Sequence, residues 1–438
     1  MLSPRSKRVR ALRTRAALGR ARLAALLRRA RLMFLADPGP AVEQEVAVTG
    51  AQVLLEAASS LRGGAAKVAQ LMAYLQDPER EPQQAAQALL GTLFDRLPGS
   101  DPAGIRRVVQ EDLGRPPEQI FAVWEEAPMA AASLGQVHGA RGLGGEDLAV
   151  KVQYPQVAEA LLAELDNQAI LRELSGAALG GGLPQAALSA LRDAILRECD
   201  YREEARFQER FRRLYRPDPQ VVIPRIFADF SSRRVLTAER LRGQCLLDFA
   251  RSAREQARQV AALCIFRVAF GAPLVHGLLN ADPNPGNFLV LGDGRVGFVD
   301  FGCCIELDER VVRCEQVLWQ ALLAGDAEAL RYTFCHEGLV REPIELDSDR
   351  YRAWERCLHL PFATPRFRTD PGYARELALH TSALVRGGRF TLPRELVLLW
   401  RQRLGLWAVL GQLRAEGNFR GALLDLLREV DMAPAGVT

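Results

Sequence analysis

Residues 282–302 read DPNPGNFLVLGDGRVGFVDFG, and this stretch decides the fold. It contains two short apolar runs, 288–291 and 295–299, which are joined by a Gly-Asp-Gly turn. Apolar runs around such a turn are typical of a β-hairpin. Because a hairpin returns the chain to its starting point, we expect Asp300 to lie beside Asn287.

Three side chains of this stretch match the residues that phosphoryl transfer requires. The reaction needs an acid that orients the phosphoryl acceptor, and an amide and a carboxylate that hold Mg²⁺ against the phosphates. Asp282, Asn287 and Asp300 follow one another in the order D-x-x-x-x-N and then D-F-G. We therefore predict that Asp282 is catalytic and that Asn287 and Asp300 bind Mg²⁺.

Lysine is rare in this chain, with only three lysines among 57 basic residues. One of them, Lys151, lies in a second predicted hairpin, whose strands are expected at 133–140 and 148–152. A lysine is a compact charge on a flexible stem, whereas arginine is a wide planar fork. We expect Lys151 to contact the nucleotide phosphates and to pair with a helical glutamate, Glu204, with Glu203 as the alternative.

The order of these patterns predicts an α+β, protein-kinase-like bilobal fold. Four parts are expected: a basic leader over 1–40, a helical N-terminal extension over 41–120, a kinase-like N-lobe over 121–242 and a mostly helical, kinase-like C-lobe over 243–438. A nucleotide should bind between the two lobes.

Local patterns give further structural expectations. A strand pair is predicted at 221–230 and 235–239, and beyond it the chain should be helical apart from the hairpin near residue 290. The apolar run 404–413 predicts a buried helix. By this reading no segment reaches the roughly 20 apolar residues that span a bilayer.

Composition excludes several classes of protein. With 438 residues, 48% of them hydrophobic and 25% charged, the chain is long enough for a large core. Its eight cysteines form no C-x-x-C pair and its five histidines form no H-E-x-x-H motif. Disulfide frameworks, metal clusters and zinc hydrolases are therefore disfavoured, and a reducing compartment is expected.

The positive charge is concentrated at the N-terminus. Residues 1–36 hold ten arginines, one lysine and no acid, so the net charge of +4 for the whole chain leaves −7 for the rest. Apolar residues recur there at helical spacing, which favours a helix on an anionic membrane surface. A solvated tail and a transit peptide are the alternatives. Because the remainder is acidic, nucleic acid is not expected as a partner.

At the level of motifs, the chain resembles the UbiB-type (AarF-like) atypical kinase family, which is associated with ubiquinone biosynthesis and isoprenoid lipid metabolism. The resemblance covers about residues 60–302 and rests on the two blocks above together with AAASLGQVH at 130–138, AVKVQYP at 149–155 and ECDY at 198–201. It implies an alanine-rich loop in place of a glycine-rich one. The nucleotide contacts that it implies are Ala130, Ala131, Ala132, Ser133, Gln136, Lys151, Glu198, Asp200 and Glu204.

In this family a helical N-terminal extension packs over the nucleotide cleft, so the resemblance implies the same for the extension here. The family's extension carries a K-x-G-Q motif, which corresponds here to Lys67-Val68-Ala69-Gln70. The resemblance implies a catalytic role for Lys67 and a nucleotide contact for Gln70. Lys67 would place a positive charge over the cleft, near Glu198 and Asp200. The chain departs from the motif at Ala69, and it has Asn280 where many members have histidine. Asparagine cannot shuttle a proton near neutral pH.

These patterns predict an ATP-binding or ADP-binding, Mg²⁺-dependent atypical kinase or ATPase of lipid or quinone metabolism. We expect a bacterial, cytoplasmic protein with peripheral contact at the inner membrane face, and lipid or quinone-pathway molecules or enzymes as partners. Two alternatives remain open: a nucleotide-binding regulatory scaffold that transfers no phosphate, and a small-molecule phosphotransferase.

Overall fold

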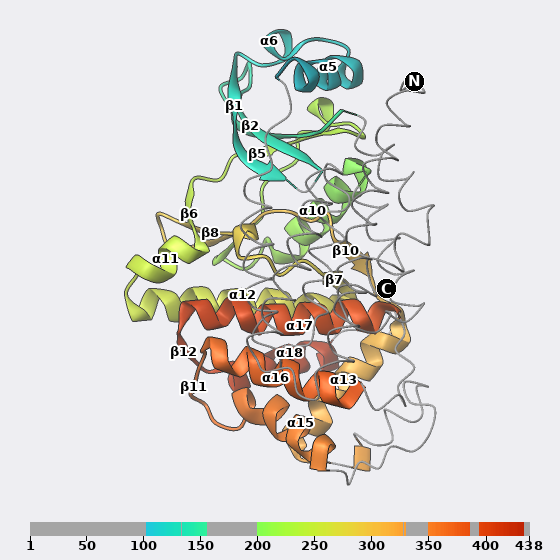
Figure 1. Cartoon of the computed structure of the whole chain (residues 1–438), viewed down its shortest axis with the longest axis vertical. Coiled ribbons are helices and arrows are strands. Elements are labelled where there is room, and N and C mark those ends of the chain that lie inside the picture. Colours follow the sequence, from blue (N-terminus) through green and yellow to red (C-terminus); the bar gives the residue numbers. More distant parts are fainter. Residues whose placement is uncertain are drawn as a thin grey trace, which may run out of the picture. The chain divides into compact units, whose positions relative to one another are not determined.

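The computed structural model describes residues 102–132, 134–155, 199–326, 328–329, 349–385 and 394–432. The leader, most of the helical extension, and the predicted site residues Lys67, Gln70, Ser133 and Glu198 lie outside these ranges. The chain divides into two compact units (Figure 1). The first unit comprises Met1–Arg202 and Phe227–Glu239, and the second comprises Glu203–Ile226 and Arg240–Thr438.

The first unit contains a four-stranded antiparallel sheet in the order β1-β2-β3-β5 (Figure 1). Its strands are β1 (Val123–Ala132), β2 (Gly135–Arg141), β3 (Asp147–Gln153) and β5 (Val235–Glu239). The predicted hairpin is confirmed as β2 and β3. In its turn the backbone N–H of Gly142 donates to the Glu146 carbonyl at 2.9 Å.

Alternation along β3 builds the core of this unit. Leu148, Val150 and Val152 are all 0% exposed and pack with the apolar face of helix α5 (Pro102–Leu113), while Ala149 and Lys151 point to the opposite face. The short helix α6 (Pro117–Ile120) follows α5 and also contributes to this core. Thus residues 102–120, which we assigned to the extension, pack into the core of the first unit.

The predicted strand at 235–239 is confirmed as β5, but the predicted strand over 221–230 and its pairing with β5 are wrong. Only β4 (Val221–Val222) is a strand in the first segment, and it pairs in parallel with β9 of the second unit, while β5 pairs with β3. Pro224, which has no N–H for a ladder, follows β4 closely, and residues 228–230 form a 3₁₀ turn, η1 (Ala228–Phe230).

The second unit contains the decisive hairpin in a sheet of order β4-β9-β8-β6. Strands β8 (Phe288–Leu291) and β9 (Val296–Phe298) pair with Phe288 opposite Phe298, and β6 (Gly243–Cys245) lies at the edge. Gly294 closes the turn with a φ of 87°, a conformation that glycine adopts at little cost. The hairpin prediction is therefore confirmed.

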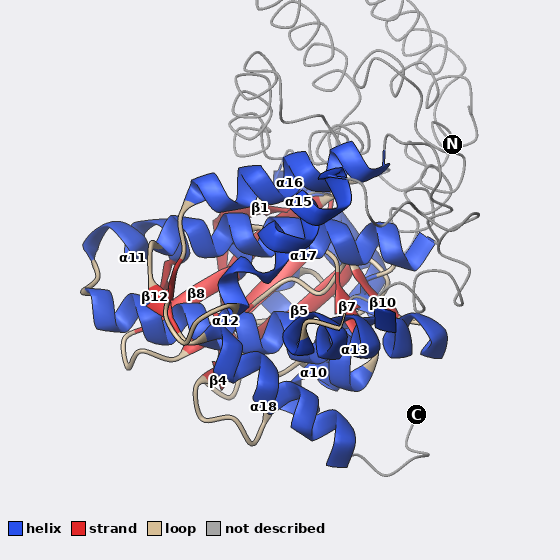
Figure 2. Ribbon diagram, turned by 90° about the horizontal axis from the view of Figure 1, so that it is seen from below, coloured by secondary structure: helices blue, strands red, loops and turns tan. Residues whose placement is uncertain are grey.

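The rest of the second unit is mostly helical (Figure 2). The helices are α10 (Tyr201–Tyr215), which begins in the first unit, α11 (Leu246–Ser252), α12 (Glu255–His276), α13 (Glu309–Ala324), α15 (Asp349–His359), α16 (Pro371–Val385), α17 (Arg394–Leu413) and α18 (Phe419–Met432). Two short strand pairs were not predicted: β7 (Leu278–Asn280) with β10 (Cys304–Glu306), and β11 (Phe367–Arg368) with β12 (Glu416–Gly417). Strands of two or three residues are too short for periodicity to reveal.

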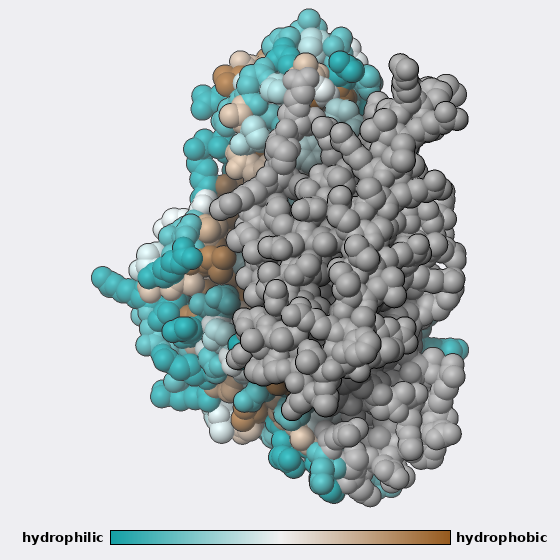
Figure 3. All heavy atoms as spheres, viewed as in Figure 1, coloured by the Kyte–Doolittle hydropathy of each residue, from teal (hydrophilic) through white to brown (hydrophobic). Residues whose placement is uncertain are grey.

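Helix α12 is the central helix of this unit and packs against α17 and α18. By length and composition alone it could cross a membrane, which the sequence reading overlooked, but 61% of its most apolar window is buried in the protein. The expected buried helix at 404–413 is confirmed as part of α17, where Trp407 and Leu410 are at most 1% exposed. The described surface in the view of Figure 3 is mainly hydrophilic, with smaller hydrophobic areas.

Candidate active site

Lys151 lies on the central part of the sheet in the first unit, opposite Val137 of β2 and Leu236 of β5. Its Nζ is 5.0 Å from the centroid of the Tyr201 ring, a distance at which a cation is attracted to the ring face. The Tyr201 backbone N–H donates to the Arg233 carbonyl at 3.0 Å, which ties the start of α10 to this unit. The lysine is thus positioned by regular strand pairing.

The three alanines of the predicted alanine-rich loop end strand β1 instead of forming a loop. Ala130 pairs with Val137 and therefore shares the sheet face of Lys151. Ala132 pairs with Gly135, whereas Ala131 lies on the opposite face. Only alternate alanines can therefore face a nucleotide held by Lys151.

Gln136 does not lie where its predicted nucleotide contact requires. Because its neighbour Val137 is opposite Lys151, Gln136 points to the other face of the sheet, where it is 2% exposed. Its Nε2 donates to His138 Nε2 at 2.8 Å, and His138 Nδ1 donates to the Glu125 carbonyl, also at 2.8 Å. Burial lowers the pKa of His138, which keeps the imidazole neutral as this pattern requires.

Asp200 lies just before the first residue of α10. Its Oδ1 accepts from the Arg202 backbone N–H at 3.0 Å, which makes Asp200 the N-cap of the helix. The Arg202 guanidinium donates to both carboxylate oxygens, at 3.0 and 2.6 Å, and holds the pKa of Asp200 below its usual value. The proposed contact of Asp200 with Lys67 stays a prediction.

The two candidate partners of Lys151 have different environments. Glu204 is 4% exposed, while Glu203 binds the Arg206 guanidinium at 2.9 Å on a solvated face of α10. Of the two candidates, Glu204 is thus the buried carboxylate and Glu203 the solvated one. The pair of Lys151 with Glu204 joins residues of two units and stays a prediction.

Asp282 and Asn287 contact each other in the second unit. The Asn287 Nδ2 donates to Asp282 Oδ2 at 3.1 Å and to the Asp282 carbonyl at 3.3 Å. Asn287 belongs to the 3₁₀ turn η2 (Pro285–Asn287), and Asn284 caps this turn by accepting from the Gly286 N–H. The amide oxygen of Asn287 is thereby turned away from Asp282.

Asp300 lies beside Asn287, as predicted. The backbone N–H of Val299 donates to the Asn287 carbonyl at 2.9 Å, immediately after the paired end of the hairpin. Asp300 has a φ of 69°, a left-handed conformation that aspartate adopts more readily than most residues. Its Oδ1 accepts from the Gly302 N–H at 3.0 Å. The structure therefore brings Asp282, Asn287 and Asp300 to one place.

Asn280 is a residue of this site that sequence reasoning missed. Its Nδ2 donates to the Asp300 carbonyl at 3.0 Å, and its Oδ1 accepts from the Asp282 backbone N–H at 3.1 Å. A single amide thus joins the two acidic segments. The departure from histidine at this position was noted in the sequence, but only the structure gives the asparagine a function.

The same place in the second unit holds several acids, with the Arg401 guanidinium 3.4 Å from Asp282 Oδ1. Cys304 is buried, and its pKa is raised well above its usual value, first by burial and then by the neighbouring Cys303, Asp300, Glu204 and Asp282. Three carboxylates are therefore near one buried thiol. Such a concentration of negative charge favours cations, whether an ammonium group or a metal ion.

The donor set fits Mg²⁺. Asn287 would bind the ion through its amide oxygen, since its nitrogen is used by Asp282, and Asp300 would bind it through its carboxylate. Mg²⁺ prefers such hard oxygen ligands and is commonly held by one or two protein groups together with substrate phosphates. When bound, the ion would neutralise charge on the phosphates.

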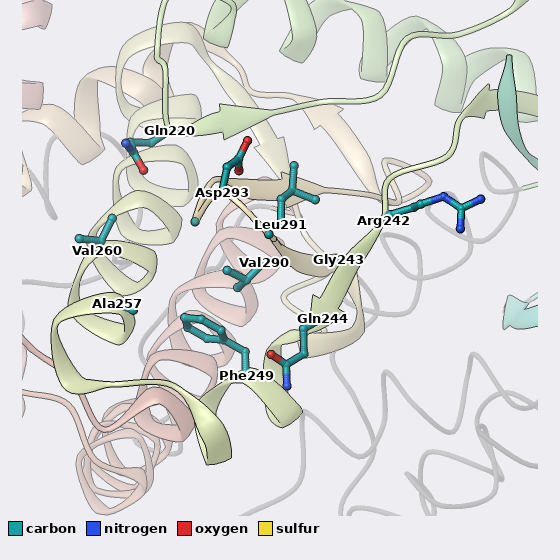
Figure 4. Close-up of a pocket in the computed structure, with 12 residues that line it drawn as sticks. Gln220, Arg242, Gly243, Gln244, Phe249, Ala257, Val260, Val290, Leu291 and Asp293 are labelled. Atoms are coloured by element: carbon teal, nitrogen blue, oxygen red, sulfur yellow. The ribbon is translucent and has the colours of Figure 1, made fainter.

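Two cavities lie near these elements in the described part of the second unit. One, of about 40 Å³, is lined by Asn280, Asp282, Pro283 and Gln402 together with apolar side chains. The other, of about 770 Å³, is formed by α11, α12, β6 and the β8–β9 turn and shares no lining residue with the acidic site (Figure 4). The larger cavity is therefore a separate feature.

Comparison with known proteins identifies the family. Residues 92–333 match the ABC1 atypical kinase-like domain, which is more than half of the 438 residues. The chain belongs to this family. The predicted resemblance to UbiB-type (AarF-like) kinases and the kinase-like α+β fold are thereby confirmed.

The relatives of the chain include proteins named as mitochondrial atypical kinases. The chain is 30% identical to the mitochondrial atypical kinase COQ8B of Danio rerio over 391 residues, which is 86% of this chain and 60% of the relative. It is 28% identical to the mitochondrial atypical kinase COQ8 of Saccharomyces cerevisiae over 249 residues, 56% of this chain and 48% of the relative. The chain thus spans about half to 60% of these two relatives.

A solved structure supports the fold. The Mycobacterium tuberculosis protein Rv3197, solved as a complex with erythromycin, superimposes with a TM-score of 0.61 at 24% identity, and the match covers 83% of this chain and 95% of that one. At this level of identity the similarity concerns the fold alone.

Proposed function

We propose that this ABC1 protein is an ATP-binding, Mg²⁺-dependent atypical kinase or ATPase that supports ubiquinone or other isoprenoid lipid metabolism. The observation that carries the proposal is the convergence of Asp282, Asn287 and Asp300, with the Asn287 nitrogen on Asp282 and its oxygen turned away. Family membership and the names of the COQ8 relatives support the lipid role.

In this proposal each side chain has one role. Lys151 binds the phosphates and pairs with Glu204, Asn287 and Asp300 hold the metal, and Asp282 orients the phosphoryl acceptor. Ala130 and Ala132 lie on the face of Lys151 and would border the nucleotide. Lys67, Gln70, Ser133 and Glu198 keep the roles that the resemblance implies, while Gln136 acts within the sheet.

We propose a cytoplasmic protein whose basic residues 1–36 contact anionic lipid at the inner membrane face. The COQ8 relatives are named as mitochondrial, so organellar import is the alternative for that segment. Co-flotation with vesicles separates the two: loss of binding to anionic vesicles on deletion of residues 1–36 supports membrane contact, and unchanged binding contradicts it.

The test of the function is phosphate release from Mg²⁺-ATP by the full chain, alone and with vesicles of neutral or anionic phospholipid. We expect release that requires Mg²⁺ and rises with the lipid. Nucleotide binding without release would favour a regulatory scaffold. Release that rises instead with small alcohol acceptors would favour a small-molecule phosphotransferase.

A further inference from the structure

Helix α17 contacts the loop that carries Asp282 at two positions one helical turn apart. Arg401 Nη2 lies 3.4 Å from Asp282 Oδ1, and the two side chains are 2% and 6% exposed. Gly405 faces Pro283, the residue after Asp282: a Cβ added to this glycine would lie 2.1 Å from Pro283 Cγ. Since atoms cannot approach so closely, the helix reaches this loop only with glycine at 405.

Two further residues of α17 extend this contact. Gln402 and Leu406 of α17 line the 40 Å³ cavity that Asp282 and Pro283 also line. The helix is itself fixed in the core, because Gln402 Nε2 donates to the Ala269 carbonyl of α12 at 2.8 Å. Helix α17 is therefore a rigid support under the loop.

Both oxygens of the Asp282 carboxylate are held from different sides. Arg401 contacts Oδ1, and Asn287 donates to Oδ2 at 3.1 Å. Together these contacts fix the plane of the carboxylate. A carboxylate offers about four lone-pair positions, so one contact on each oxygen leaves acceptor capacity in that plane.

A second buried ion pair on the same helix, between Arg403 and Glu315, serves as a structural comparison for the Arg401 contact. Arg403 Nη2 lies 2.9 Å from Glu315 Oε2, and the Arg403 guanidinium stacks 3.7 Å from the centroid of the Phe270 ring. This pair is short and enclosed by the core. The Arg401 contact is longer, and its carboxylate belongs to the loop with Asn287.

We propose that Arg401 and Gly405 of α17 are positioning residues for Asp282. Arg401 orients the carboxylate through Oδ1, and Gly405 sets the distance between the helix and the loop. The inference rests on the proposed function, because it assigns to these residues a role in phosphoryl transfer. It follows from the contacts rather than from burial, since buried ion pairs are weak evidence for a contribution to stability.

The chemistry explains why a fixed carboxylate matters. Asp282 accepts a hydrogen bond from the hydroxyl or water that attacks the γ-phosphorus: the new P–O bond forms as the bond to the leaving nucleotide diphosphate oxygen breaks, and the acceptor's proton passes to Asp282. A displacement of about 1 Å at such a group can lower the rate on the order of 100-fold. Nucleotide binding through Lys151 and Asp300 should be much less affected.

The experiment measures kcat and the KM for ATP in the full chain with Mg²⁺. The test variants are Arg401→Met, Arg401→Lys and Gly405→Ala. Two matched controls lie on the same helix. Arg403→Met breaks the other buried ion pair. Gly411→Ala introduces a Cβ 2.9 Å from the Asp370 carbonyl group, whereas the Cβ of Gly405→Ala meets Pro283. Thermal unfolding is measured for all five variants.

We expect kcat to fall roughly 10-fold to 100-fold in Arg401→Met and Gly405→Ala, with the KM for ATP changed less than about threefold. Arg401→Lys keeps the charge and should recover part of the loss. The controls should lower the unfolding temperature and leave the kcat of the folded protein near that of wild type. If Arg401→Met does not fold, the lysine and alanine variants carry the test.

A kcat that simply follows thermal stability across all variants, controls included, overturns the inference and leaves the proposed function intact. The same holds if Arg401→Met and Gly405→Ala keep the wild-type kcat. A wild-type protein that binds Mg²⁺-ATP but releases no phosphate contradicts the proposed function, and the positioning role is then withdrawn with it.

Discussion

The two units hold their predicted site residues in different ways. In the first unit Lys151 is fixed by continuous antiparallel pairing on both sides, with Val150 and Val152 buried beside it. In the second unit Asp282 and Asp300 depend on individual side-chain bonds and on a left-handed backbone at Asp300. Regular pairing distributes the positioning over many bonds, whereas the acidic site depends on a few.

This difference implies that single substitutions should act differently in the two units. Replacing a neighbour of Lys151 should lower the stability of the first unit without moving Lys151, because the hydrogen bonds between the strands remain. Replacing one amide or guanidinium around Asp282 should change geometry directly.

The largest effect is expected for Asp282→Asn in the second unit. Loss of the group that accepts the proton should lower kcat for phosphate release by on the order of 10²–10⁴-fold, while Mg²⁺-ATP still binds. The substitution also leaves Arg401 buried beside a neutral amide, so thermal stability should fall. Asp293→Asn is the control and should keep the wild-type rate, because Asp293 lies in the exposed turn between β8 and β9.

A smaller effect is expected for Asn280→Ala, which removes the two side-chain bonds of Asn280, one to each acidic segment. We expect a loss of about 1–3 kcal/mol in the free energy of unfolding, together with a lower kcat. The matched control is Asn418→Ala, because Asn418 accepts from the Gly421 N–H at the start of α18. If Asn280→Ala, like Asn418→Ala, loses stability while kcat is unchanged, the proposed contrast between the two units fails.

In the first unit Lys151→Arg should weaken nucleotide binding although the charge is retained. The guanidinium fork cannot occupy the place of a compact ammonium group, while the sheet should tolerate the change. Calorimetric titration with ATP should show weaker binding, with the unfolding temperature nearly unchanged. Arg141→Lys, the reverse exchange at the exposed end of β2, serves as control. Full retention of affinity would remove Lys151 from the phosphate site.

The smallest effect is a pH dependence that belongs to the first unit. Burial lowers the pKa of His138 from 6.5, so the unfolded chain takes up a proton more readily than the folded one. His138 therefore destabilises the fold as the pH falls below about 6.5, by at most about 1.4 kcal/mol per pH unit. Thermal unfolding from pH 7 to pH 5 should be less pH-dependent in His138→Gln, and the remaining slope should include His276, whose pKa burial also lowers.

Sequence alone could predict the hairpins, because their turns and apolar runs are local signals. The proximity of Asn287 and Asp300 followed from one of these turns. The sequence could not predict the sheet face of Gln136, since a shift of one residue in strand register moves every side chain of the strand to the opposite face. The parallel pairing of β4 with β9 joins segments about 75 residues apart without any local turn signal.

The supporting residues of the acidic site were also beyond sequence reasoning. Arg401 is 119 residues from Asp282, in a chain where almost every basic residue is arginine, so its identity carried no signal. Asn280 was recognised only as a departure from a histidine. Both roles follow from tertiary packing of α17 and β7 around one loop, which no pattern of spacing encodes.

The effect of Mg²⁺ on thermal stabilisation by ATP, compared between wild type and Asp300→Asn, tests the proposed metal-nucleotide site most directly. Wild type should gain a clear additional rise in unfolding temperature when Mg²⁺ accompanies ATP, and the variant should lose most of that addition while keeping the part due to ATP alone. An identical response of the two proteins to Mg²⁺ would contradict a metal-nucleotide site at Asn287 and Asp300.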